Sequence, residues 1–221
     1  MVDLTKLDPE TTARHLRKPE GDIGLALADS MSVRNWPIYE AALERLAARA
    51  GDRLFEVGFG NGKLVPRLLA LAHEATYAGI DFSETMVAEA KAFNETLIEA
   101  GRASFRLASV DAIPFADGSF DRAMTLNTIY FWPEPIQALA EIRRVLRPEG
   151  RFLVWVEAAE RMKQSPFTRH GFRLYAKPKL CEMHESAGFH RVQVETYRDN
   201  APSLDGGGTI EREGIFIVST A

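Results

Sequence analysis

A short segment of the chain combines an acidic residue with three glycines at alternate positions. The run Glu56-Val57-Gly58-Phe59-Gly60-Asn61-Gly62 follows a stretch rich in β-forming residues. Glycine permits the positive φ angles of a tight strand-to-helix turn and lets a ligand approach the backbone, and the next helix offers unpaired N–H groups. The segment predicts a binding site for a nucleotide-like ligand, although glycines could also serve a purely structural turn here.

The glycine spacing and the acid before it indicate which kind of ligand would bind. A dinucleotide-binding Gly-x-Gly-x-x-Gly pattern counted from Gly58 would need its third glycine where the chain has Lys63. A carboxylate at Glu56 that points into the loop suits a cationic amine better than a pyrophosphate. The segment therefore favours a ligand with positive charge over a nicotinamide dinucleotide.

Two further acidic residues follow the next two expected strands. Asp81 ends the expected strand 76–81, about 20 residues after the glycines, where a carboxylate can accept hydrogen bonds from both ribose hydroxyls. Asp111 follows the expected strand 103–108 and could accept a hydrogen bond from an adenine amino group. Asp81 could instead cap a helix, and Asp111 could form a turn. Because open parallel sheets bind ligands at the carboxyl ends of their strands, these positions favour binding.

Two apolar residues beside Asp81 could flank an adenine ring. Phe82 and Met86 follow the acid within a few positions. Met86 could equally begin the buried stripe of the helix that Ser83 caps, because a methionine fills core space well.

The elements that must position these residues alternate along the chain. Short β-rich runs alternate with longer runs of helical periodicity, which is typical of an α/β fold with a parallel sheet covered by helices. The expected strands are 53–57, 76–81, 103–108, 120–126, 151–156, 191–197 and 214–219. The expected helices are 37–50, 63–72, 84–100, 134–146 and 179–187, the first with Pro37 at its first position.

Composition limits the fold and the partners. The 221 residues are 46% hydrophobic and 26% charged, as in a soluble globular chain with one core. A net charge of -4 creates no field that would attract a polyanion, so nucleic acid is not an expected partner. The N-terminus lacks the apolar core of a signal peptide, and no stretch approaches the ~20 apolar residues of a membrane span. We therefore expect a cytoplasmic protein without a membrane span.

Signatures of other enzyme classes are missing from the sequence. It contains no Gly-x-Ser-x-Gly elbow, no His-Glu-x-x-His and no paired Cys-x-x-Cys. The one cysteine, Cys181, falls in an expected helix and is assigned no chemical role. Neither a metal site nor hydrolytic chemistry is expected.

Several segments together resemble one enzyme family. In order and spacing they resemble the class I S-adenosylmethionine-dependent methyltransferases, most of all the small-molecule branch that includes ubiquinone and menaquinone biosynthesis methyltransferases. The segments are 56–62, 79–83, 111–115, 120–121 and 145–150. The resemblance implies a Rossmann-like doubly wound sheet of seven strands, mostly parallel with the last strand antiparallel. It assigns 37–221 to the methyltransferase domain and leaves 1–36 as an N-terminal arm or possible lid. One departure is Glu149, where the family commonly has glycine.

The resemblance also implies a role for each residue of the site. Glu56 and the glycines would hold the methionine portion of S-adenosylmethionine, Asp81 the ribose, and Asp111 with Ala112 the adenine. Asn127 would border the methionine amine and the transferring methyl. The implied cofactor-binding residues are Glu56, Gly58, Phe59, Gly60, Asp81, Phe82, Met86, Asp111, Ala112 and Asn127.

Catalysis of methyl transfer does not by itself require a base. The sulfonium makes the methyl electrophilic, so alignment of a nucleophile and exclusion of water can be sufficient. A base is needed where the acceptor must lose a proton. Candidates are His170, which could also be a solvated loop histidine, and Tyr130, which with its aromatic neighbours could instead line an acceptor pocket. The catalytic residue stays open.

The function expected from the sequence is methyl transfer to a small-molecule acceptor. No Asn-Pro-Pro-Tyr run, common in nucleic-acid and protein amide methyltransferases that resemble this fold, begins at Asn127. Two alternatives stay open. One is a sensor or assembly protein that binds S-adenosylmethionine without catalysis, and the other is a nicotinamide-dependent oxidoreductase, which the glycine spacing disfavours.

Overall fold

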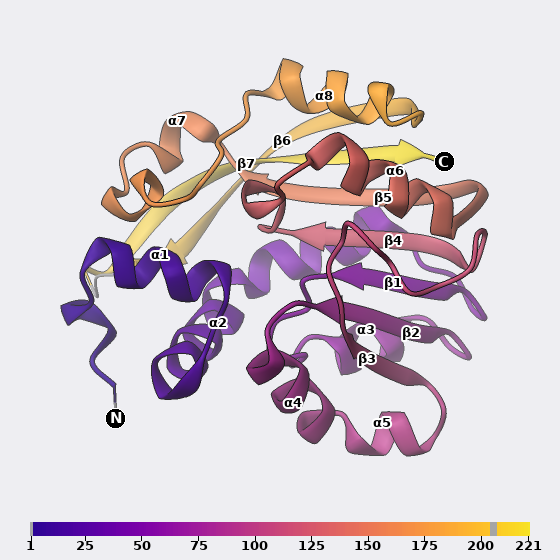
Figure 1. Cartoon of the computed structure of the whole chain (residues 1–221), viewed down its shortest axis with the longest axis horizontal. Helices are drawn as coiled ribbons and strands as arrows, with labels where there is room; N and C mark the ends of the chain where they lie inside the picture. The colour runs from indigo at the N-terminus through magenta and orange to yellow at the C-terminus, as the bar shows by residue number, and fades with distance from the viewer. Residues whose placement is uncertain (1, 204–206) are drawn as a thin grey trace.

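The centre of the molecule is a β-sheet with helices on both faces (Figure 1). In residues 2–203 and 207–221, which the computed structural model describes, seven strands pair in the order β3-β2-β1-β4-β5-β7-β6. They are β1 (Arg53–Val57), β2 (Thr76–Asp81), β3 (Ala103–Leu107), β4 (Phe120–Leu126), β5 (Leu146–Glu157), β6 (His190–Pro202) and β7 (Thr209–Thr220). Neighbouring strands from β3 to β5 are parallel, and β7 is antiparallel to β5 and β6. The expected doubly wound sheet with an antiparallel last strand is confirmed.

Most of the helices form two layers, one on each face of this sheet. They are α1 (Pro9–Arg17), α2 (Gly21–Leu46), α3 (Val65–Leu71), α4 (Glu84–Phe93), α5 (Glu95–Glu99), α6 (Pro135–Val145), α7 (Ala159–Met162) and α8 (Lys177–Ser186), with 3-10 helices η1 (Leu4–Lys6), η2 (Ile129–Phe131) and η3 (Pro166–Arg169). Apolar residues of α6 and α8 cover one face, and those of α2, α3 and α4 cover the other. Successive strand residues point to opposite faces, so Leu54 packs in one layer and Phe55 in the other.

The helix expected to begin at Pro37 begins at Gly21 instead, and Pro37 lies inside α2. A proline inside a helix removes the N–H that would bond to the carbonyl four residues earlier, here that of Val33. Val33 is exposed, so water can reach that part of the helix. Buried residues on both sides of the proline, such as Leu27 and Ile38, hold the helix in one piece. The division of the chain after residue 36 falls within this helix and stays a prediction.

The single helix expected over 84–100 is two helices, α4 and α5, which meet at Asn94. The Asn94 side chain is buried and donates hydrogen bonds to the carbonyls of Ala90, at 2.8 Å, and Gly62, at 3.1 Å. The Asn94 side chain therefore connects the end of α4 to Gly62, the last residue of the glycine segment. Strands β6 and β7 extend further than expected, because they pair with each other well beyond β5.

The N-terminal residues lie at the end of the sheet where the parallel strands terminate (Figure 1). Helix α1 and the first half of α2 are placed there, and the Ser83 hydroxyl donates to the Pro19 carbonyl at 2.5 Å. Ala13 and His15 of α1 and Leu27 of α2 are buried. The N-terminal helices thus pack onto the carboxyl ends of the strands. Within the described residues, no helix has the length and apolar character needed to cross a bilayer.

Candidate functional site

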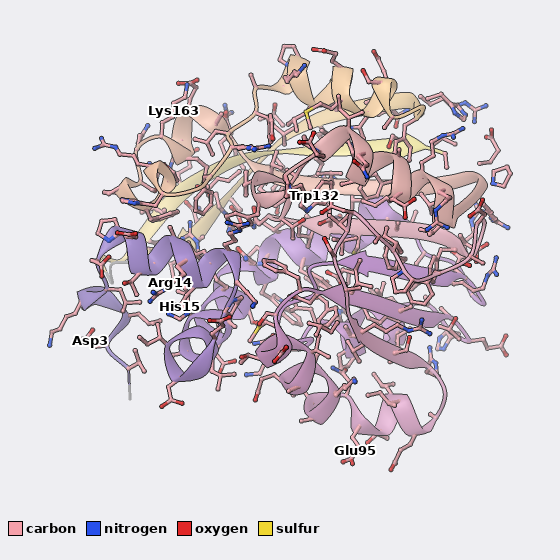
Figure 2. The ribbon with its side chains drawn as sticks, viewed as in Figure 1. Asp3, Arg14, His15, Glu95, Trp132 and Lys163 are labelled. Carbon is pink, nitrogen blue, oxygen red and sulfur yellow. The ribbon has the colours of Figure 1, made fainter. Side chains whose placement is uncertain are left out.

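A cavity of about 760 Å³ lies at the carboxyl ends of β1, β2, β4 and β5. Its floor includes the last residues of these strands and the loops that follow them, and α1 and α2 contribute its opposite wall. Figure 2 shows Arg14 and His15 on α1 at this end of the molecule. Volumes of about 300–1,000 Å³ are typical of small-molecule and cofactor sites. This cavity is therefore the candidate functional site.

The cavity brings together all of the predicted cofactor-binding residues except Ala112. Those that line it are Glu56, Gly58, Phe59, Gly60, Asp81, Phe82, Met86, Asp111 and Asn127. Ala112 is exposed, and its N–H already donates to the Ser109 carbonyl at 3.2 Å. The strand-end positions of the acids account for the convergence, because parallel strands end at the same edge of the sheet.

The three glycines of the segment have different structural roles. All have positive φ angles, 75° at Gly58, 60° at Gly60 and 69° at Gly62. A Cβ at Gly58 would collide with the Thr128 side chain, and one at Gly62 would lie 2.7 Å from the Cβ of Ala90. A Cβ at Gly60 would meet nothing within 4 Å. Packing requires two of the glycines, whereas Gly60 faces open space on the cavity wall.

Two buried carboxylates give this part of the cavity its electrostatic character. Glu56 accepts a hydrogen bond from the Tyr77 hydroxyl at 2.7 Å, and burial raises the pKa of Glu56 to about 7. Asp81 accepts from the N–H groups of Gly60 at 3.2 Å and Ser83 at 2.9 Å, and burial raises its pKa to about 6. Neither forms an ion pair within residues 2–203 and 207–221. A cationic ligand would stabilise both ionised carboxylates.

Two polar atoms on the cavity wall lack a hydrogen-bond partner among the described residues. They are the hydroxyl of Tyr39 and Oδ1 of Asp111, both buried. The other oxygen of Asp111 accepts from the Ser109 hydroxyl at 3.0 Å. Buried polar atoms are normally bonded, so both atoms are positions where a bound ligand could supply the partner. Tyr39 was not predicted from the sequence, because it lies within an apolar helical stretch and reads as core.

The second part of the cavity begins at Asn127, just after β4. Asn127 has a φ of 59°, a left-handed conformation that asparagine tolerates better than most residues. Its Oδ1 accepts a hydrogen bond from the Tyr130 hydroxyl at 3.2 Å, and that hydroxyl accepts one from the N–H of Glu157 at 2.6 Å. Burial raises the pKa of Tyr130 above its ordinary value, so its phenol stays protonated. In this structure Tyr130 orients Asn127 and is poorly suited to take up a proton.

His170, the other candidate base, lies outside the cavity. It follows η3, its side chain is exposed, and it is not among the lining residues. The structure thus brings Tyr130 to the site and leaves His170 in contact with solvent.

Aromatic side chains form the apolar wall of this second part. Phe131 and Phe172 pack edge to face with ring centroids 4.6 Å apart, and Phe167 lies 5.6 Å from Phe172. All three line the cavity together with Trp132, which Figure 2 labels, and Met162. The expectation that aromatics near Tyr130 could shape an apolar acceptor pocket agrees with this placement.

Several residues of the cavity were not predicted from the sequence. Arg34 of α2 lies 3.7 Å from the carboxylate of Glu157, the last residue of β5. Asn61, in the glycine segment, accepts from the Ser32 hydroxyl and donates to Asp29, each at 2.9 Å. All these contacts join the N-terminal helices to the strand ends. No pattern within either segment indicated them, because the partners are far apart in sequence.

The described residues contain no metal-binding cluster, that is, no group of three or more His, Cys, Asp or Glu side chains placed to hold an ion. The polar groups of the site are instead the carboxylates, hydroxyls and backbone N–H groups described above.

Comparisons with known proteins agree with the geometry of the site. Residues 55–154 match the model of a methyltransferase domain family. The O-methyltransferase resE of Aspergillus sclerotiorum is 30% identical over 163 residues, which are 71% of this chain and 61% of that protein. A ubiquinone/menaquinone biosynthesis C-methyltransferase of Paracoccus denitrificans is 38% identical over 114 residues, 52% of this chain and 46% of that one. The chain thus spans about half to three fifths of these relatives.

A solved structure supports the fold over nearly the whole chain. The SAM-dependent methyltransferase of Aquifex aeolicus superposes with a TM-score of 0.64 at 20% identity, over 97% of this chain and 99% of that one. The domain match runs from Phe55 in β1 to Val154 in β5 and includes the glycine segment, Asp81 and Asn127. Residues 55–154 are therefore identified as a methyltransferase domain, and the fold of the chain is similar to that of a solved SAM-dependent methyltransferase.

Proposed function

We propose that this chain binds S-adenosylmethionine and transfers its methyl group to a small-molecule acceptor held in the same cavity. The observation that carries the proposal is the two-part cavity. One part has buried carboxylates and an open glycine backbone, and the other has an aromatic wall. Asn127 and Tyr130 stand between the two parts.

The residues of the first part fit the cofactor. Glu56 would hold the cationic amine of the methionine portion, and Asp81 the ribose hydroxyls. Gly60 leaves space for the ligand to approach the backbone. Asp111 offers an unpartnered oxygen toward the adenine, and Tyr39 an unpartnered hydroxyl. All of these residues line the cavity, and the bound cofactor would supply the hydrogen-bond partners.

The protein's part in the reaction would be orientation and exclusion of water. The bound cofactor supplies an electrophilic methyl group on a sulfonium. Tyr130 fixes the side chain of Asn127 through the 3.2 Å hydrogen bond, so the amide is held between the two parts of the cavity. The N-terminal helices cover the strand ends, and we propose that residues 1–36 act as a lid that shields the reacting groups.

A small acceptor fits the limited and partly apolar space beside the cofactor site. The aromatic wall of Phe131, Phe167 and Phe172 suits a compact apolar body. Curated relatives are described as O-methyltransferases and C-methyltransferases, which supports a small acceptor here.

The proposal is tested by binding and turnover measured on the same purified protein. Calorimetry with S-adenosylmethionine should show binding, with NAD as a control ligand that does not bind. Incubation with quinone-like, phenolic and amine acceptors should then produce S-adenosylhomocysteine with at least one class. Cofactor binding without any product would favour a sensor or assembly role. Binding of NAD in place of S-adenosylmethionine would overturn the proposal.

Replacing Tyr39 by phenylalanine should weaken S-adenosylmethionine binding about 3- to 10-fold, because a hydrogen bond contributes about 0.5–1.5 kcal/mol. The hydroxyl has no hydrogen-bond partner among the described residues, so the free energy of unfolding of the ligand-free protein should stay the same or rise slightly. Calorimetry and urea unfolding measure the two effects. Tyr197→Phe, outside the cavity, serves as the matched control. An unchanged affinity for the cofactor would show that Tyr39 does not contact it.

Binding should also release a proton near pH 6.5. The pKa of Glu56 is about 7 in the ligand-free site because the carboxyl is buried, so the group is mostly protonated at that pH. A bound cation would lower this pKa, and about 0.5–1 proton would leave. Affinity should therefore rise with pH between about 5.5 and 7. Calorimetry in buffers of different ionisation enthalpy counts the proton, and Glu56→Gln should remove most of the release, leaving the smaller share from Asp81.

A further inference from the structure

Glu157 stands at the end of β5 with its carboxylate on the cavity wall. Its side chain is 16% exposed, and the nearest cation, Nη2 of Arg34, is 3.7 Å away, which is too long for a hydrogen bond. In the described part of the chain, neither carboxylate oxygen accepts a hydrogen bond from another residue. Both carboxylate oxygens of Glu157 can therefore accept hydrogen bonds from a ligand in the cavity.

The charged groups around Glu157 make contacts with other residues. Arg34 of α2 is buried and donates to the Pro202 carbonyl, and Arg161 of α7 donates to Gln164 at 2.9 Å. Arg212 of β7 is committed to Asp199 of β6, with one contact of 2.9 Å. Burial raises the pKa of Glu157, and the nearby arginines, Arg34 first, oppose that effect.

Glu157 is joined through the backbone to the residues at the centre of the cavity. Its N–H donates to the Tyr130 hydroxyl at 2.6 Å, and Tyr130 in turn donates to Asn127. The aromatic wall of Phe131 and Phe172 lies against the same tyrosine, with ring centroids at 6.0 and 5.7 Å from it. Tyr130 is thus in contact both with the backbone of Glu157 and with the aromatic wall, and all four residues line the same cavity.

The other titratable groups in this part of the cavity are poor proton acceptors. Burial lowers the pKa of His15, and its Nδ1 accepts the N–H of Glu20 at 3.4 Å. The neutral ring therefore carries its hydrogen on Nε2 and can only donate there. Tyr130 stays protonated, and Arg34 and Arg161 are cations. Of the described titratable residues on this wall, Glu157 is the one whose side chain can accept a proton.

We propose that Glu157 takes the proton of a hydroxyl-bearing aromatic acceptor whose ring packs on Phe131 and Phe172. This rests on the methyl transfer proposed above. The acceptor oxygen forms a bond to the methyl carbon while the carbon–sulfur bond of the sulfonium donor breaks, and that electron pair stays on sulfur. The O–H bond breaks, and its proton moves to a Glu157 oxygen. Arg34 is a positioning residue that holds the carboxylate in place.

The charge of this wall favours a hydroxyl over a cationic amine as the accepting group. Arg34 and Arg161 together exceed the single negative charge of Glu157, while Arg212 and Asp199 compensate each other. The net positive charge would repel a cationic amine placed here. A neutral phenol would not be repelled, and its hydroxyl could donate a hydrogen bond to Glu157. The substrate class follows from this balance.

The first test uses 4-nitrophenol as a probe bound in the presence of S-adenosylhomocysteine. The visible band of its phenolate reports the pKa of the bound probe without turnover. Wild-type protein should bind the neutral phenol. In Glu157→Gln, Arg34 loses its counter-charge, so the pKa of the bound probe should fall by about 1–3 units. Glu160→Gln, an exposed residue of α7, should leave this pKa unchanged.

The second test compares methylation of phenols of different acidity. Glu157→Gln should slow the methylation of weakly acidic phenols about 100-fold or more and affect already ionised phenols little. Glu157→Asp keeps the carboxylate and should restore part of the rate, which separates loss of the base from loss of folding. Equal loss across the series, an unchanged probe pKa, or absence of 4-nitrophenol binding would overturn the proposal. Methylation of amines but not phenols would overturn the substrate class. Failure to bind S-adenosylmethionine would instead contradict the proposed function.

Discussion

Replacing Asp81 by asparagine should weaken S-adenosylmethionine binding about 30- to 1,000-fold. The carboxylate ends β2 on the cavity floor and is the group expected to accept both ribose hydroxyls. Hydrogen bonds to a charged acceptor contribute about 1.5–3 kcal/mol each. Asparagine keeps the shape and one acceptor oxygen but loses the charge, so about 2–4 kcal/mol of binding should disappear.

In the ligand-free protein at pH 8 the same substitution has two opposing effects, so we expect little net change in stability. Asparagine removes a buried charge, but its NH2 group cannot accept one of the two N–H bonds from Gly60 and Ser83. Burial raises the pKa of Asp81 from 3.8 to about 6, so the folded state binds its proton more tightly than the unfolded chain. The stability that this provides is complete below about pH 4 and is lost as pH rises through 6. Asparagine removes the buried charge, and the fall in stability between pH 4 and 6 should become shallower.

Calorimetric titration and urea unfolding distinguish a ligand contact from a structural one. Glu84→Gln is a matched control, because Glu84 is exposed in the first turn of α4 and lies outside the cavity. A variant that loses stability and affinity together would indicate that Asp81 mainly holds the loop through its bonds to Gly60 and Ser83. Unchanged affinity in a folded protein would contradict the ribose assignment.

Much of the sheet and part of the site could be predicted because they depend on local sequence. The β-forming residues of Arg53–Val57 indicate a strand, and the glycines after them indicate a turn. Both predictions need only the local sequence. The helix boundaries at Pro37 and Asn94 could not be predicted in this way. Pro37 continues a helix because residues on both sides are buried, and Asn94 ends one because its side chain bonds to Gly62.

The residues that were missed depend on contacts between distant parts of the chain. Tyr39 belongs to a buried helical stretch, and only the cavity beside its hydroxyl distinguishes it from core. Glu157 ends an ordinary buried strand, and Arg34 lies in a segment that reads as a separate arm. Their pairing across the cavity becomes visible when α2 is placed over β5. The strand-end acids Asp81 and Asp111 were predictable because strand order alone brings them together.

Substitution of alanine for glycine should separate the structural from the ligand-binding role of the glycine segment. Gly58→Ala should destabilise the ligand-free protein by about 3 kcal/mol or more. Its φ of 75° costs an L-residue about 1–2 kcal/mol, and its methyl would in addition collide with Thr128. The Thr128 hydroxyl is hydrogen-bonded to Thr125, so the side chain has little freedom to move away.

Gly60→Ala should cost only the backbone strain, about 1–2 kcal/mol, because its methyl would meet no atom of the described residues within 4 Å. That methyl would occupy space beside the cavity and should weaken S-adenosylmethionine binding about 100-fold. Gly51→Ala is the matched control, since Gly51 has a φ of 76°, equally open surroundings and no place on the cavity wall. Equal stability losses with lost binding in Gly60→Ala alone would assign Gly60 to the ligand. If Gly60→Ala and Gly51→Ala bind S-adenosylmethionine equally well, the ligand does not occupy the space beside Gly60. The glycine segment would then be a structural turn only.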